Sequence, residues 1–160
     1  MKTFSTSLLL SVILLTACKT EPKDFNIVFA LESLNSYKIE LEIKSDKSYS
    51  IKKQNIYFDR IARQANINSA EGEMTDEEWN ELTQLVAAAR LFKMKDSYGF
   101  TENANNDDDL FRNMMYRLEY TEGTKIKSLL IHPDLSYKYP ENLTKLTTFL
   151  SKFSSSHSEK

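Results

Sequence analysis

The 160-residue sequence contains very little cysteine, glycine, proline and histidine. Its one cysteine, Cys18, excludes an intramolecular disulfide framework and any zinc site built from several cysteines. Its three glycines, Gly72, Gly99 and Gly123, lie far apart, which excludes the glycine-rich loops that bind nucleotide phosphates. With only three prolines as well, the chain is neither collagen-like nor proline-rich.

A strong excess of charge of either sign is also absent. Lys and Arg number 21 against 23 Asp and Glu, for a net charge of −2. This balance disfavours a nucleic-acid-binding surface. The composition, 41% hydrophobic and 28% charged, is typical of a globular protein and not of a disordered chain. The length predicts a single domain.

The amino-terminal apolar run, residues 8–15, is too short to cross a bilayer as a helix, which needs about 20 apolar residues. It follows Lys2 and precedes small residues, which is the order found in a secretory signal peptide. The sequence Leu15-Thr16-Ala17-Cys18 resembles the lipobox of bacterial lipoproteins. The resemblance implies a diacylglyceryl group on the Cys18 sulfur, cleavage before Cys18 and acylation of the new amine. Two or three acyl chains are enough for stable membrane attachment. The alternative is an ordinary signal peptide with a chance cysteine.

The expected parts of the chain are a cleaved signal peptide (1–17), a lipidated tether (18–24), one folded domain (25–153) and a flexible tail (154–160). The residue after Cys18 is Lys19 and not the aspartate that resembles an inner-membrane retention signal in some Gram-negative bacteria. We therefore expect a lipid-anchored protein of the bacterial cell envelope, at the outer membrane. Whether it faces the periplasm or the cell surface stays open.

Strict alternation of apolar and charged side chains over residues 37–44 is typical of a strand with one buried and one wet face. A turn at 45–47 and a returning strand from Tyr49 predict an antiparallel hairpin. Glu122-Gly123 is a two-residue turn that predicts a second hairpin. The other strands that we expect span 25–34, 55–68, 114–121 and 124–131.

Two helices are predicted. Thr75 and Glu78 have the spacing of a capping box, and Met74 and Trp79 are placed for a hydrophobic staple. Apolar residues then recur at three- and four-residue spacing, which predicts a helix to about Leu91. The second helix has Pro140 in its first turn. Its apolar stripe consists of Leu143, Leu146, Phe149, Leu150 and Phe153.

These elements predict an α+β fold, with a mostly antiparallel sheet of about five strands and two helices packed on one face. The order strands, helix, hairpin, helix, with Gly-x-Met-Thr-x-Glu-Glu-Trp at residues 72–79, resembles small bacterial envelope lipoprotein domains of uncharacterised role. The resemblance covers most of the mature chain. It implies a fold but no activity.

Residues 95–113 show no periodicity and predict a loop long enough to suggest a function. Aromatic side chains beside polar ones can anchor a partner. The candidate binding residues in this loop are Tyr98, Phe100, Asp107, Asp108, Asp109 and Phe111. For each aromatic the alternative is packing against the core. The pattern of a calcium-binding EF-hand fails, because Leu110 stands where that loop requires glycine. We therefore expect no metal and no cofactor.

We expect a non-catalytic envelope lipoprotein whose domain binds another envelope component, while its lipid confines it to a membrane. Cys18 is expected to be alkylated and His157 lies in the expected tail, so few groups remain for nucleophilic catalysis. The expected partners are the membrane, through Cys18, and an unidentified envelope protein, with no nucleic acid. The alternative is a carboxylate- or metal-dependent hydrolase that uses Asp107–Asp109 with His132.

Overall fold

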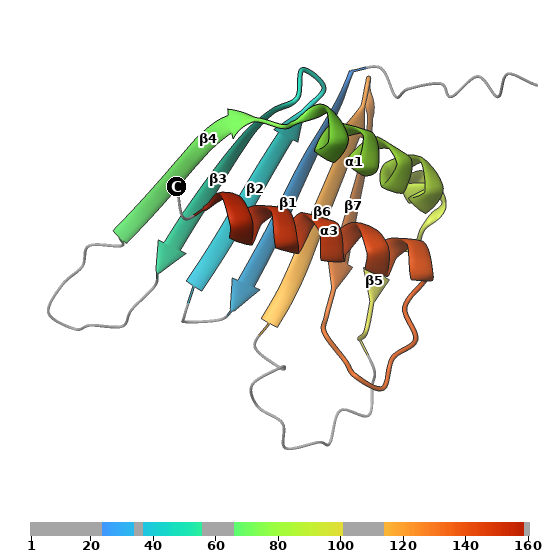
Figure 1. The fold of residues 1–160 in the computed structure, drawn as a ribbon. Coiled ribbons are helices and arrows are strands. Elements are labelled where there is room, and N and C mark those ends of the chain that lie inside the picture. The colour runs from blue at the N-terminus through green and yellow to red at the C-terminus, as the bar shows by residue number, and fades with distance from the viewer. Residues whose placement is uncertain (1–23, 34–36, 56–65, 101–113, 159–160) are drawn as a thin grey trace, which may run out of the picture.

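The structure is a computed structural model that describes residues 24–33, 37–55, 66–100 and 114–158. In this part of the chain, seven strands form one mostly antiparallel sheet. Two helices, α1 (Asp76–Ala89) and α3 (Glu141–His157), cross one face of the sheet (Figure 1). The predicted α+β class and two-helix layer are confirmed, whereas the count of about five strands is wrong. No helix in these ranges combines the length and apolar character needed to span a bilayer.

The strands are β1 (Phe25–Ser33), β2 (Tyr37–Lys44), β3 (Ser48–Asn55), β4 (Asn66–Glu73), β5 (Ser97–Tyr98), β6 (Met114–Glu122) and β7 (Lys125–Ile131). Their order across the sheet is β4-β3-β2-β1-β6-β7-β5. The first four strands form an antiparallel meander, and the β6–β7 hairpin pairs with the free side of β1. The short strand β5 adds to β7 in parallel. The central strand is therefore the first one in the sequence.

The core lies between the helices and the sheet face that they cover. Cross-strand register places Ile27 beside Ile43 and Leu41 beside Ile51 on that face. The most buried side chains, at most 1% exposed, include Ile27, Leu41, Ile51, Leu118 and Leu129 from the sheet and Leu82, Leu146 and Leu150 from the helices. Burying one such side chain contributes about 1.5–3 kcal/mol, so this single layer dominates the stability.

The capping box at the start of α1 is confirmed. The Glu78 backbone N–H donates to Thr75 Oγ1 at 3.2 Å, and the Thr75 N–H donates to Glu78 Oε2 at 2.8 Å. The helix ends at Ala89, because Arg90 takes a left-handed conformation with φ of 50°. A short 3₁₀ turn, η1 (Leu91–Lys93), follows. The predicted helix end at Leu91 is therefore two residues too late.

The tail expected from residue 154 is wrong, because α3 continues to His157. Ser154 is only 3% exposed, and its hydroxyl donates to the Ser151 carbonyl at 3.0 Å. The His157 ring stacks on Phe153, with centroids 4.1 Å apart. Serine-rich sequence has a weak helix propensity, and these contacts outweigh it here.

Two other boundaries also differ from prediction. β4 continues to Glu73, beyond the expected end at residue 68, and residues 56–65 lie outside the described ranges. The sequence of β4 shows little alternation of apolar and polar residues. Its strand conformation therefore follows from pairing with β3. The expected loop 95–113 contains β5, which pairs with the end of β7.

Candidate functional site

A pocket of about 200 Å³ opens between α3 and one end of the sheet. Its floor is formed by Tyr116 of β6 and Ile131 of β7, which are direct cross-strand partners. Leu143 and Thr147 of α3 form a second wall, and the connection 133–139 forms a third. The lining surface is almost entirely apolar. We call this site the Tyr116 pocket.

The connecting wall is held by its own hydrogen bonds. The Tyr139 hydroxyl donates to the His132 carbonyl and accepts from the Asp134 N–H at 2.9 Å. Asp134 Oδ1 in turn accepts from the Ser136 N–H at 2.8 Å and from Ser136 Oγ at 2.6 Å. A wall fixed in this way loses little conformational entropy when a ligand binds. The pocket is therefore preorganised.

The phenols in the pocket are uncharged at neutral pH. Burial raises the pKa of Tyr116 above its ordinary value, and the nearby phenol of Tyr37 adds to the effect. Burial also raises the pKa of Tyr139. Tyr116 lines the pocket, and a protonated phenol hydroxyl can donate a hydrogen bond to a ligand or accept one from it.

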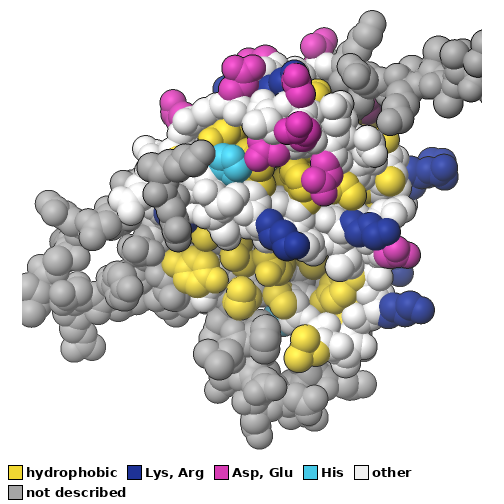
Figure 2. Space-filling model, viewed as in Figure 1, with side chains coloured by type: hydrophobic (Ala, Val, Ile, Leu, Met, Phe, Trp, Pro, Cys, Tyr) yellow, Lys and Arg dark blue, Asp and Glu magenta, His cyan; other side chains and the backbone are white. Residues whose placement is uncertain are grey.

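Partly exposed apolar surface continues from the pocket. Figure 2 shows hydrophobic side chains gathered along the lower side of α3. The register of the sheet places Leu31 between Ile39 and Tyr116 on the helix-covered face, and all three are only partly buried. At the rim of the pocket Leu135 is 89% exposed. Exposed apolar surface beside a pocket is typical of an interaction site.

The opposite face of the sheet is charged. Lys38 Nζ lies 3.2 Å from a carboxylate oxygen of Glu32 and 3.2 Å from one of Glu40. Burial would lower the pKa of Lys38, but hydrogen bonds to Glu40 and Glu32 outweigh burial and raise it. Arg117 reaches Glu40 at 3.7 Å. Charges of opposite sign alternate here, so this face has no single-sign field to attract a charged partner.

The predicted binding residues fall in different places. Tyr98 is only 7% exposed within β5, and its hydroxyl accepts from the Lys95 N–H at 3.1 Å. This placement corrects the expectation of an exposed anchor, because pairing with β7 draws the residue into the core. Phe100 is 55% exposed, and its ring centroid lies 5.6 Å from that of His132. The other predicted site residues, Cys18, Asp107, Asp108, Asp109 and Phe111, lie outside the described ranges.

The hydrolase hypothesis therefore stays a prediction, since only His132 of its groups is described. The His132 N–H donates to the Tyr98 carbonyl at 2.9 Å, which places this residue directly after the last pairing of β7. Among the described residues, no group of three or more His, Cys, Asp or Glu side chains could hold a metal ion.

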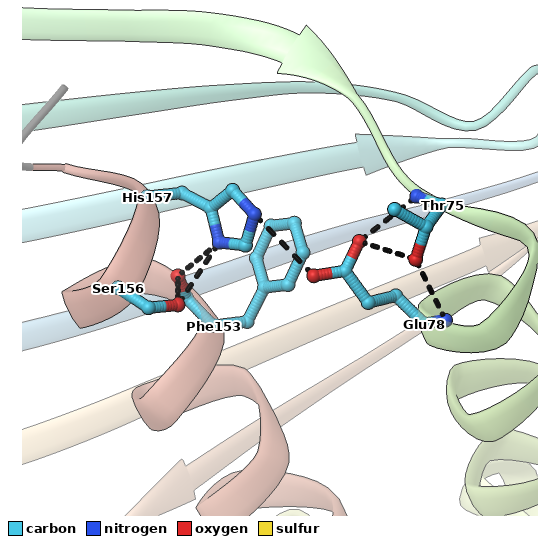
Figure 3. A network of polar contacts seen from close by, with 5 residues as sticks. All are labelled: Thr75, Glu78, Phe153, Ser156 and His157. Atoms are coloured by element: carbon cyan, nitrogen blue, oxygen red, sulfur yellow. Dashed lines mark hydrogen bonds and ion pairs between the residues drawn. The ribbon is translucent and has the colours of Figure 1, made fainter.

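A second polar network joins the two helices (Figure 3). His157 Nε2 lies 3.3 Å from Glu78 Oε1, and Ser156 Oγ lies 3.0 Å from His157 Nδ1. A serine, a histidine and a carboxylate thus contact one another in the same order as in the catalytic triad of a hydrolase. However, Ser156 Oγ donates to the Phe153 carbonyl of its own helix, and Glu78 is engaged by Thr75. These bonds favour a structural role, and they hold in place a histidine that we expected in a flexible tail.

Sequence reasoning missed the Tyr116 pocket. Tyr116, Ile131 and Leu143 were correctly expected in strands and in a helix, but no periodicity shows that a helix leaves space above two strands. The connection 133–139 contains one signal that could have been used. It contains Leu135, Tyr137 and Tyr139, three large side chains in a short turn where polar residues are usual.

Comparisons with known proteins do not assign this chain to a family. The sequence matches neither a protein-family model nor a curated protein. Function must therefore be argued from the residues of this chain.

Proposed function

We propose that this protein is a lipid-anchored component of the bacterial cell envelope whose folded domain binds a partner without catalysing a reaction. The observation that carries the proposal is Leu15-Thr16-Ala17-Cys18 at the end of a short apolar run. Acyl chains on Cys18 would hold the domain at a membrane, where confinement raises its effective concentration toward a membrane partner.

Asp24 defines where a tether would leave the domain. The Asp24 carbonyl accepts from the Gly123 N–H at 3.2 Å, in the β6–β7 turn. Six peptide units separate Cys18 from Asp24 and span at most about 20 Å. A lipid on Cys18 would therefore keep this end of the sheet close to the membrane.

The Tyr116 pocket lies toward the opposite end of the sheet. β1 runs from Phe25, paired with Glu122, to Ser33, paired with Met114. Tyr116 pairs with Leu31, which is about 20 Å along the strand from Phe25 at roughly 3.3 Å per residue. The proposed anchor would thus turn the pocket and its apolar rim away from the bilayer, toward a partner.

The test compares wild type with Cys18→Ala, both produced in a Gram-negative host. We expect intact mass to show diacylglyceryl and acyl groups on the wild type, and the wild type to partition into detergent. Both properties should disappear in Cys18→Ala, because Cys18 carries the one thiol of the sequence.

Thr20→Ala, two residues beyond the motif, serves as the matched control and should behave as wild type. A wild-type protein of unmodified mass that stays in the aqueous phase would show that the anchor is wrong. Binding would then have to take place in free solution.

A further inference from the structure

We infer that the Tyr116 pocket receives an aromatic side chain of a protein partner, while the apolar rim contacts the residues that flank this side chain. The inference rests on the proposed binding function and names the chemistry that is bound. It uses the volume of the pocket, its lining and the surface that surrounds it.

The volume sets the size of the group. An engineered apolar cavity of about 150 Å³ binds benzene. At about 200 Å³, the Tyr116 pocket accommodates a substituted ring or a compact pair of fused rings. The described floor and walls would contact such a group, and the pocket is open to the surface, which gives a path for the connection to a polypeptide.

The lining favours an uncharged ring. The Tyr116 ring stacks on Phe29, with centroids 5.7 Å apart and planes 16° apart, so Phe29 fixes its orientation. The Tyr139 ring contacts Tyr137 in a tilted arrangement, with centroids 4.8 Å apart and planes 59° apart. Fixed rings offer faces and edges to another aromatic group, which adds about 0.5–1.5 kcal/mol beyond area burial. The Tyr116 hydroxyl could bond an indole N–H or a phenol hydroxyl.

The surroundings favour a side chain over a free small molecule. A freely diffusing ligand needs only the pocket, whereas a protein anchor also needs contact surface around it. Leu135, at 89% exposure, and the partly exposed row of Leu31 and Ile39 provide that surface beside the pocket. Anchors of this kind in protein interfaces are enriched in tryptophan and tyrosine.

The experiment uses the full mature protein in detergent, with methyl resonances of Ile131 and Leu143 as reporters of the pocket. The probes are N-acetyl-tryptophanamide, N-acetyl-leucinamide and free indole. We expect saturable shifts at both methyls with the tryptophan amide and binding that is weaker by about tenfold with the leucine amide.

Two neighbouring residues of α3 give a matched pair of variants. Thr147 lines the pocket, whereas Thr148 is exposed on the helix. Thr147→Phe should fill the pocket and abolish the saturable shifts, and Thr148→Phe should leave them unchanged. Leu135→Ala removes an exposed rim side chain and should weaken binding by about twofold or more, without affecting folding.

Several results would overturn the inference. Shifts that never saturate, or that are equal in Thr147→Phe and Thr148→Phe, would mean partitioning into detergent. Tighter binding of the leucine amide would assign an aliphatic occupant. Binding of indole but not of the tryptophan amide would assign a free small molecule. The reporters lie in the folded domain, so these results are read independently of whether Cys18 carries lipid.

Discussion

The Glu78 carboxylate joins the first turn of α1 to the last turn of α3. Its Oε2 accepts hydrogen bonds from the N–H and hydroxyl of Thr75, and its Oε1 lies 3.3 Å from His157 Nε2 (Figure 3). At the other end of the helix pair, Asn142 Nδ2 donates to the Ala88 carbonyl at 2.9 Å. The antiparallel helices are therefore connected at both ends above one shared core.

Removal of this carboxylate should destabilise the protein. Glu78→Ala removes half of a capping box and the contact with His157, for an expected loss of about 1–2 kcal/mol of unfolding free energy. His157→Ala keeps the capping box and should lose less unfolding free energy than Glu78→Ala. Urea denaturation measures both losses. The matched control is Glu81→Ala, which changes an exposed position one turn later and should stay within about 0.5 kcal/mol of wild type. Equal losses in Glu78→Ala and Glu81→Ala would contradict the role of the network.

Two glycines should differ in their response to alanine. Gly99 has φ of +78°, and an added Cβ would lie 2.0 Å from the His132 carbonyl oxygen and 2.5 Å from the Tyr139 hydroxyl. Gly123 has φ of +57°, but nothing lies within 4 Å of an added Cβ. Gly123→Ala should cost about 1 kcal/mol from backbone strain alone. Gly99→Ala should cost clearly more and should disturb the wall of the Tyr116 pocket. Thermal unfolding of the two variants measures both losses of stability. A smaller loss in Gly99→Ala than in Gly123→Ala would contradict the close contact of Gly99 with His132 and Tyr139.

Stability should fall at high pH because of Tyr120, which is 3% exposed. Burial, with a further contribution from Glu122, raises the pKa of this phenol to about 12. An unfolded tyrosine has a pKa of about 10. The folded state thus holds the proton more tightly, so this stabilisation is complete below pH 10 and is lost as pH rises from about 10 through 12. The loss is on the order of 2–3 kcal/mol.

Unfolding free energies at pH 9 and pH 11 test this titration. Tyr120→Phe keeps the ring and removes the ionisable hydroxyl. Its stability should decline less between these pH values than that of wild type, because the other phenols are the same in both proteins. Identical declines would mean that Tyr120 does not titrate in the folded state as described.

Two leucines, one buried and one exposed, should differ in how much their substitution by alanine destabilises the protein. Leu146 is fully buried under α3, and Leu146→Ala should cost about 2–5 kcal/mol because it leaves a cavity. Leu135 is 89% exposed, and Leu135→Ala should stay within about 0.5 kcal/mol of wild type. Chemical denaturation of both variants measures the difference. A large loss in Leu135→Ala would show that this side chain is part of the core and not of a binding rim.

Local sequence was enough to predict the elements whose stability is local. The capping box at Thr75 needs only four consecutive residues, and the strand at 37–44 is specified by strict alternation. Both were confirmed. β4 was only partly predicted, because Ser69, Glu71 and Glu73 carry no strand signal and depend on the backbone of β3.

The candidate site was largely beyond sequence reasoning, because it depends on residues from distant segments. His157 is held by Glu78, which belongs to the other helix. The Tyr116 pocket needs a sheet floor, a helix wall and a connection tied by Tyr139. Of the predicted binding residues that are described, Phe100 is exposed and Tyr98 is buried. An aromatic residue in an aperiodic segment carries no signal that separates these two outcomes.

The central position of β1 determines the order in which the protein can assemble. β2 begins at Tyr37, four residues after β1 ends, but the other neighbour of β1, β6, begins only at Met114. Closing so long a loop costs entropy and slows folding, so the meander β1–β4 can form well before the sheet is complete. During that interval the free edge of β1 exposes unpaired backbone groups that can pair with another chain. Pairing of β6 with β1 therefore also closes this edge to other chains.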